Sequence, residues 1–151
     1  MIGSSSALTG LAFCLTDTPD VADVKLIEDR LDAFNAEHAP PTDRQPLCVF
    51  VRSDKGVTLG GVTGYTEQQW LYLDCFWLPD ELRARSGVGS HILVIAENEA
   101  RRRGCGHVRL YTYSFQAPHF YAARGYERFG ELVGFPPGHS QIWLKKTLDC
   151  A

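Results

Sequence analysis

The chain has 151 residues and a formal net charge of −3, so it is long enough to bury a core and we expect one domain over residues 1–151. Hydrophobic residues make up 44% and charged residues 22%, a balance that is ordinary for a soluble globular protein. The mild negative charge offers no footprint for nucleic acid. No apolar run approaches the roughly 20 residues that span a bilayer. We therefore expect neither nucleic acid nor membrane as a partner.

The cysteine pattern predicts a reducing compartment. The five cysteines are odd in number and show no Cys-x-x-Cys spacing, whereas a disulfide framework needs pairs. No basic region precedes a long apolar stretch at the N-terminus, so the pattern indicates no secretory signal. We expect a cytoplasmic protein. The five histidines show no metal-ligand spacing, so we predict no metal site.

The first half of the chain predicts a strand, a helix and an antiparallel meander. Residues 1–8 are small and polar and predict a loose arm. Residues 11–15 are predicted to form a first strand. Thr18 precedes Pro19 as an N-cap, and the helix that follows is expected to end near His38, before a pair of prolines. Strands are predicted at 47–51, 57–65 and 70–78, with a hairpin turn at 53–56.

The second half predicts a helix from Val88 to Arg103 that stops at Gly104. Because this helix separates the strand at 70–78 from a strand at 108–114, those two strands should run parallel. A helix at 118–124 and strands at 126–132 and 142–148 complete a mixed α/β (α+β) fold. The predicted sheet has about seven strands, antiparallel at both ends and parallel at the centre, and is flanked by helices. The apolar last strand should pair with its predecessor and offer an edge to a second copy, so we expect a homodimer, which light scattering can test.

The segment from Arg83 to Ser90 is the most informative stretch. It lies between a predicted strand and a predicted helix, where backbone N–H groups at the helix N-terminus favour phosphate. A P-loop would need Lys and then Ser or Thr after Gly89, but Ser90 and His91 stand there. A dinucleotide fingerprint would need glycine at Ile92. Two interpretations of the segment remain: a glycine turn that binds no ligand, and a phosphate-binding loop of a third kind.

Two motifs resemble the Gcn5-related N-acetyltransferase (GNAT) family. Gly87-x-Gly89 fits the second half of its pyrophosphate motif, Arg/Gln-x-x-Gly-x-Gly/Ala. Downstream, a strand is followed by Phe120-Tyr121 in a short helix and then by Gly and an aromatic residue, similar to the family's second signature. The resemblance covers roughly residues 60–148. The family's first arginine falls at Ala84, so the loop between strand and helix is one residue longer than usual.

The resemblance implies an acetyl-CoA-dependent N-acetyltransferase that acts on the primary amine of a small molecule by direct transfer in a ternary complex. In the family, the strands that match 70–78 and 108–114 splay apart to hold the pantetheine arm, and a backbone N–H near Trp77 or Leu78 would polarise the thioester carbonyl. The cofactor-binding residues implied for this chain are Phe76, Trp77, Leu78, Arg85, Ser86, Gly87, Val88, Gly89, Ser90, Gln116 and Tyr121.

Two residues are candidates for proton transfer. Tyr121 matches the family tyrosine that often protonates the departing thiolate, although a tyrosine there could also serve packing alone. Asp74 lies within an apolar strand, where a carboxylate is unusual unless paired or functional. Strand alternation puts Asp74 on one face with Tyr72 and Phe76. Asp74 could accept the amine proton, directly or through water, or it could hydrogen-bond to a neighbouring loop.

Several alternatives stay open at this level. Glu131 and Tyr113 are reserve candidates for the base, and His119 reads as a surface residue at a helix start. The function could instead be that of a non-catalytic CoA-binding module, which the altered loop favours, or of a peptide or protein N-terminal acetyltransferase. The aromatic residues at 65, 70, 72, 77, 111 and 113 could line an acceptor pocket or belong to the core.

Overall fold

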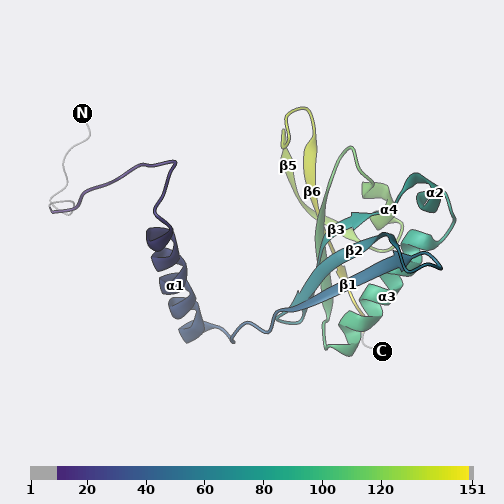
Figure 1. Ribbon diagram of the computed structural model, residues 1–151, viewed down its shortest axis with the longest axis horizontal. Helices are drawn as coiled ribbons and strands as arrows, with labels where there is room; N and C mark the ends of the chain where they lie inside the picture. The colour runs from purple at the N-terminus through teal and green to yellow at the C-terminus, as the bar shows by residue number, and fades with distance from the viewer. Residues whose placement is uncertain (1–9, 150–151) are drawn as a thin grey trace. The chain divides into compact units, whose positions relative to one another are not determined.

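The computed structural model describes residues 10–149 (Figure 1). The chain divides into two compact units, Met1–Pro41 and Thr42–Ala151, which we describe separately. The expected loose arm at residues 1–8 lies outside the described residues, and the expectation of one domain stays a prediction. Among residues 10–149 no helix is both long and apolar enough to cross a bilayer.

Over its described residues, 10–41, the first unit contains one helix, α1 (Val21–His38). The Asp20 carboxylate caps it by accepting the Ala22 N–H at 2.8 Å, so the helix starts two residues beyond the predicted Thr18 cap. It ends at His38, as the following prolines predict. The strand predicted at 11–15 is wrong: these described residues are in no strand, because a strand needs a neighbour for its backbone hydrogen bonds and no segment pairs with them.

The second unit is a mixed sheet with the strand order β1-β2-β3-β4-β6-β5. Among the described strands only β3 and β4 run parallel, and the other pairs are antiparallel. This confirms the predicted architecture, with six strands over residues 10–149 instead of about seven. The helix α3 (Val88–Arg102) makes the crossover between the two parallel strands. The strands are β1 (Gln45–Arg52), β2 (Thr58–Glu67), β3 (Trp70–Trp77), β4 (His107–Tyr113), β5 (Glu127–Val133) and β6 (Ser140–Thr147).

The last strand is not an edge strand. β6 pairs with β4 on one side and with β5 on the other, so the expectation that 142–148 offers a free edge to a second copy is wrong. The expected pairing with its predecessor in sequence is confirmed, but the chain inserts β6 between β4 and β5. The edges of the sheet are β1 and β5. Assembly into a homodimer stays a prediction.

The two parallel strands separate part-way along their length. They pair over only four residues, from Trp70↔His107 to Leu73↔Leu110. At the same point the register between β2 and β3 shifts, which leaves Asp74 as the extra residue of a β-bulge. Gly64 allows this close approach, because a Cβ there would collide with the Tyr72 carbonyl oxygen.

The bulge also reverses the alternation of side chains along β3. Leu71 and Leu73 are buried in the core, and beyond the bulge Phe76 packs against that same core. The expectation that Asp74, Tyr72 and Phe76 share one face is therefore wrong for Phe76. Strand alternation predicts faces only where each residue has one partner opposite, and the extra residue breaks that condition.

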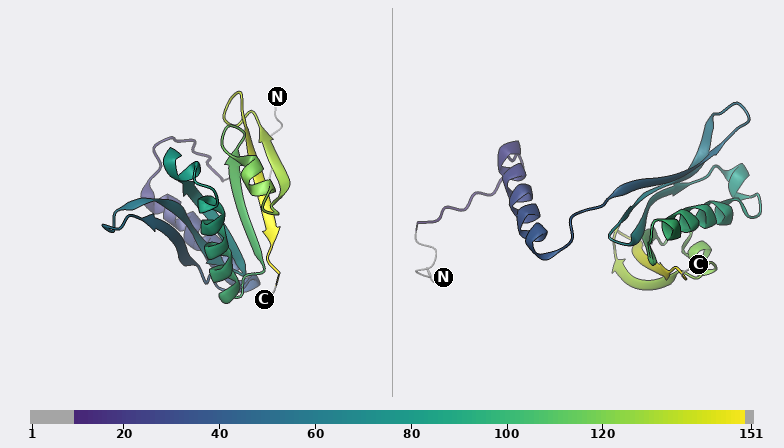
Figure 2. Two further views of the ribbon diagram at one scale, coloured as in Figure 1. Left: turned by 90° about the vertical axis from the view of Figure 1, so that its right-hand side faces the viewer. Right: turned by 90° about the horizontal axis from the view of Figure 1, so that it is seen from below.

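The core lies between the sheet and α3, which runs along one face of the sheet (Figure 2). Ile92, Leu93 and Ala96 of the helix are buried there at helical spacing. Glu97 is also buried, and it accepts hydrogen bonds from Tyr126 Oη at 3.0 Å and from Lys146 Nζ at 2.8 and 2.9 Å. A buried carboxylate needs such partners. The bonds hold α3 to β6 and to the turn before β5.

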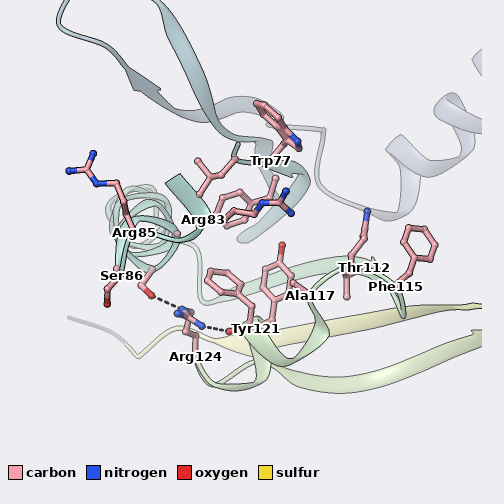
Figure 3. A pocket seen from close by; sticks show the side chains of 16 residues that line it. Trp77, Arg83, Arg85, Ser86, Thr112, Phe115, Ala117, Tyr121 and Arg124 are labelled. Atoms are coloured by element: carbon pink, nitrogen blue, oxygen red, sulfur yellow. Dashed lines mark hydrogen bonds between the residues drawn. The ribbon is translucent and has the colours of Figure 1, made fainter. Parts of the chain in front are cut away.

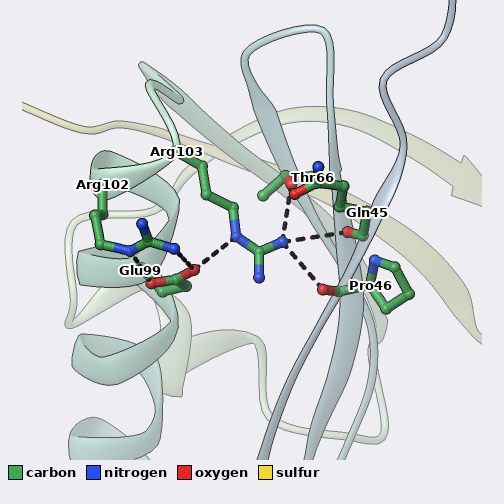
Figure 4. Close-up of polar contacts among 6 residues, drawn as sticks. All are labelled: Gln45, Pro46, Thr66, Glu99, Arg102 and Arg103. Carbon is green, nitrogen blue, oxygen red and sulfur yellow. Dashed lines mark hydrogen bonds and ion pairs between the residues drawn. The ribbon is translucent and has the colours of Figure 1, made fainter.

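The arginine cluster at the end of α3 serves the fold (Figure 4). Arg103 donates to Glu99 at 2.7 Å and to the carbonyl of Pro46 and the hydroxyl of Thr66 at 3.0 and 3.2 Å. Arg102 donates to both Glu99 oxygens at 2.7 Å. The hydrogen bonds from Arg102 and Arg103 lower the pKa of Glu99 to about 2. The cluster thus joins the helix to β1 and β2.

Candidate active site

A cavity of about 580 Å³ opens where β3 and β4 separate (Figure 3). Two short helices border it: α2 (Asp80–Arg83), which the sequence did not predict, and α4 (Pro118–Ala122), which is shorter than the predicted 118–124. The cavity is lined by Phe76, Trp77, Leu78, Arg83, Arg85, Ser86, Gly87, Gly89, Ser90, Thr112, Phe115, Gln116, Ala117, Phe120, Tyr121 and Arg124.

The structure brings the predicted cofactor-binding residues together around this cavity, with one exception. Val88 does not line it and packs against the core instead. The sequence missed six lining residues: Arg83, Thr112, Phe115, Ala117, Phe120 and Arg124. Alternation along β4 could have found Thr112, which is buried on the same face as Val108 and Leu110. No local signal distinguishes Arg124 from other surface arginines.

The N-terminus of α3 presents unpaired backbone donors. Gly87 precedes it with φ = 88°, a left-handed conformation that favours glycine, and no side chain within residues 10–149 caps the helix. Among the described residues, the N–H groups of Gly87, Gly89 and Ser90 have no protein acceptor. Such an end carries partial positive charge and suits an anion.

Gly89 makes room for a neighbouring ring. A Cβ at this position would lie 3.0 Å from two carbons of the Phe120 ring. The space beside Gly89 is therefore taken up by the Phe120 ring, which a side chain at this position would meet first. The ring of Phe120 also lines the cavity, so the two residues shape its wall jointly.

Tyr121 directs its hydroxyl into the cavity (Figure 3). Its ring packs among those of Phe120, Tyr126 and Phe76, with centroids at 5.2, 5.6 and 6.5 Å. Burial raises the pKa of Tyr121 to about 12. Among the described residues Oη has no hydrogen-bond partner, whereas every fully buried side-chain oxygen has one, so Oη reaches the open cavity. The phenol is protonated at neutral pH and can donate.

Gln116 lines the cavity and also closes the end of β4. Its Oε1 accepts from Thr112 Oγ1 and from the Tyr113 N–H, both at 3.0 Å. These bonds fix the turn that leads from β4 into α4. Gln116 therefore helps to position α4, the helix that carries Tyr121.

Asp74 does not line the cavity. It is exposed at the bulge. Burial raises the pKa of Tyr72, and the Asp74 charge adds to that effect. Burial and then Tyr113 raise the pKa of Tyr111, and the Asp74 charge adds a smaller part. The face of the sheet opposite α3 is aromatic around it: the Tyr65 and Tyr72 rings lie 5.2 Å apart, and those of Tyr111 and Trp143 also 5.2 Å.

Two arginines of the chain make cation–π contacts with rings of this aromatic face. The guanidinium of Arg44 lies 4.1 Å from the centroid of the Tyr65 ring, and that of Arg109 lies 4.4 Å from Tyr72. Trp77 behaves differently from the other aromatic candidates, because it lines the cavity. The reserve base Glu131 is on the edge strand β5, paired with Arg128, and does not line the cavity.

The lining fits coenzyme A. One end of the cavity offers free N–H groups and arginines, which suit phosphates. The other end offers the stretch of β3 that no β4 residue pairs, where an extended chain with amide groups can hydrogen-bond. The chemistry of the two ends matches a diphosphate joined to pantetheine.

The sequence profile described as the acetyltransferase (GNAT) family matches residues 16–130. The chain belongs to the GNAT family. This acetyltransferase is 33% identical over 134 residues to acetyltransferase Atu2258 of Agrobacterium fabrum, covering 89% of this chain and 97% of that protein. It is 32% identical over 126 residues to blasticidin-S acetyltransferase of Streptomyces morookaense, covering 80% and 92%.

The fold of the acetyltransferase is also that of a solved relative. It superposes on the crystal structure of an acetyltransferase from Bacillus cereus with a TM-score of 0.81 and 28% identity, covering 89% of this chain and 98% of that one. GNAT membership makes the chain an N-acetyltransferase with acetyl-CoA as co-substrate, as the two motifs predicted.

Proposed function

We propose that this acetyltransferase transfers acetyl from acetyl-CoA to the primary amine of a small molecule, directly and with both substrates bound. The observation that carries the proposal is Tyr121, whose free hydroxyl enters the same cavity that the donor-rich start of α3 lines. A small acceptor is supported by the similarity to a blasticidin-S acetyltransferase, whose name states a small-molecule substrate.

Binding of the cofactor is divided among the residues of the cavity. The N–H groups of Gly87, Gly89 and Ser90 hold the diphosphate, with Arg85 and Ser86 beside them. The backbone of Phe76, Trp77 and Leu78 aligns the pantetheine arm, and an N–H near Trp77 or Leu78 polarises the thioester carbonyl. Acetyl-CoA supplies the activated acetyl group, and the protein supplies orientation and proton transfer.

In the reaction the amine nitrogen forms a bond to the carbonyl carbon, and the C–S bond breaks. Tyr121 gives its proton to the leaving sulfur. Its raised pKa does not prevent this, because the burial that disfavours the phenolate also disfavours a thiolate beside it. Asp74 lies outside the cavity lining, but it is the first β3 residue beyond the paired stretch of β3 and β4. From that point, on the aromatic face of the sheet, it accepts the proton of the amine, directly or through water.

An amine panel tests the proposal. We expect thiol release from acetyl-CoA to depend on a small primary amine, and calorimetry to show acetyl-CoA binding in the absence of any amine. Binding without release for any amine or peptide would favour the non-catalytic module. Faster release with peptide N-termini than with small amines would favour a peptide N-terminal acetyltransferase.

The role of Asp74 has its own test. Asp74→Asn should lower kcat/KM for the best amine by about 10²-fold or more, the usual range for a general base, because the amide cannot accept the proton. The loss should shrink as the pH rises and more of the amine is already neutral. Asp54→Asn, the same change in the exposed hairpin turn, should leave kcat/KM unchanged. Equal rates for the two variants would remove Asp74 as the base.

The cellular setting stays a prediction. The four cysteines among the described residues, Cys14, Cys48, Cys75 and Cys105, carry free thiols. Free thiols are typical of proteins in a reducing environment, which supports the proposed cytoplasmic location.

A further inference from the structure

Arg124 is the most constrained arginine at the cavity. It follows α4 and is half-buried. Its Nε–H donates to Ser90 Oγ at 2.7 Å, a second nitrogen donates to the Phe120 carbonyl, and the guanidinium lies 3.7 Å from the centroid of the Phe120 ring (Figure 3). A long side chain loses conformational entropy when it is ordered. Contacts within the protein already order Arg124, so a ligand that binds it does not have to cause that loss.

Part of this guanidinium remains available to a ligand. Arginine carries five N–H donors, and the two bonds to Ser90 and Phe120 leave the others without an acceptor among the described residues. Within that part of the chain no carboxylate forms an ion pair with Arg124, in contrast to Arg101, Arg102 and Arg103. A half-buried cation without a counter-ion, beside a cavity, is placed to attract an anion.

The other two arginines at the cavity are less suited to this task. Arg83 is ion-paired to Asp80. Arg85 is exposed, and its guanidinium points away from the middle of the cavity (Figure 3). The position that would carry the family's loop arginine holds Ala84. Among the described residues, the connection before α3 therefore supplies no cation that is both held in place and free of a counter-ion.

The hydrogen bond to Ser90 shows that the Arg124 guanidinium lies at the start of α3. Ser90 belongs to the first turn of α3, and its own N–H has no acceptor in the part of the chain that the structure describes. The hydrogen bond to Arg124 thus brings a full positive charge to the same turn that presents the free backbone donors. Donors of both kinds around one point suit an anion with several oxygens, and a guanidinium fork matches phosphate geometry.

We propose that Arg124 binds the diphosphate of CoA together with the first turn of α3, and so supplies the fixed cation that the loop lacks. The proposal rests on the proposed placement of CoA in this cavity. It assigns to the end of α4 a role in holding the cofactor, in addition to carrying Tyr121.

Calorimetry with CoA tests the proposal without any turnover. Arg124→Met keeps the apolar stem against Phe120 and removes the charge and the donors. We expect the dissociation constant for CoA to rise about 10- to 100-fold, the range for losing a hydrogen bond to a charged group. Arg128→Met, the same change on the exposed edge strand β5, should bind CoA like the parent.

Dephospho-CoA distinguishes the two sources of phosphate in the cofactor. An equal loss of affinity for CoA and dephospho-CoA is expected for the diphosphate. A loss that appears with CoA alone would overturn the assignment in favour of the 3′-phosphate. If the parent protein does not bind CoA, the proposed function fails first, whereas CoA affinity that Arg124→Met leaves unchanged overturns only the role of Arg124.

A second variant covers the case in which the Met variant does not fold. Arg124→Lys keeps the positive charge but loses the planar fork. We expect its CoA affinity to lie between those of the parent and the Met variant, and weaker than the parent by about tenfold. Affinity equal to the parent in a folded Lys variant would contradict bidentate binding of the diphosphate.

Discussion

Replacing Tyr121 by Phe is expected to lower kcat by about 10²-fold or more, while the affinity for acetyl-CoA changes little. The ring packing with Phe120 and Tyr126 survives the change, and only the proton donor in the cavity is lost. The measurement is the turnover rate with the best amine of the panel, under conditions in which chemistry limits turnover.

The pH profile adds a second readout for Tyr121. Because burial raises its pKa to about 12, the donor form persists through the whole neutral range and is lost only as the pH approaches that value. We therefore expect no fall in the parent's rate from phenol ionisation between neutral and mildly alkaline pH. A rate for Tyr121→Phe within about twofold of the parent would leave water as the acid and packing as the role of the ring.

Tyr126→Phe is the matched control. It removes a hydroxyl from the ring next to Tyr121, but that hydroxyl donates to Glu97 in the core and does not enter the cavity. We expect a loss of unfolding free energy of about 1 kcal/mol, because one acceptor site on Glu97 loses its partner while Lys146 keeps the carboxylate paired. The turnover rate should stay close to the parent's.

Gly89→Val is expected to weaken acetyl-CoA binding by about 100-fold or more, the upper end of what overpacking at a binding site costs. A Cβ at this position would already lie 3.0 Å from the Phe120 ring, and the two further carbons of Val must displace that ring. Phe120 lines the cavity and supports the guanidinium of Arg124, so its movement disturbs the wall and the cation together. Calorimetry with acetyl-CoA measures the effect, and Gly89→Ala should give a smaller loss.

The control for this change is Gly106→Val. A side chain at Gly106 would meet open space, and the position lies outside the cavity lining. The same two residue types are exchanged, so a general effect of the larger side chain on folding would appear in both variants. If both variants bind acetyl-CoA like the parent, the start of α3 does not bind the diphosphate of the cofactor.

The sequence by itself determined the features that depend on neighbours along the chain. The turn at Gly87, the amphipathic run of α3 and the helical crossover between two strands are local patterns, and they predicted both the parallel pair β3–β4 and a phosphate-binding helix start. The second motif, around Tyr121, was equally local. Two such motifs at the right separation were sufficient to predict the family.

Only the tertiary structure decided the features that depend on partners distant in sequence. The segment at 11–15 has a strand pattern but no paired neighbour, and β6 takes an inner position that its own residues do not encode. The bulge at Asp74 depends on Gly64 of the adjacent strand, and it changed the face assigned to Phe76. Arg124 reaches the start of α3 through a bond to Ser90, 34 positions earlier. Each backbone or side-chain polar group needs a hydrogen-bond partner, and packing decides which distant group lies close enough to serve. The residues next to it in sequence do not determine that partner.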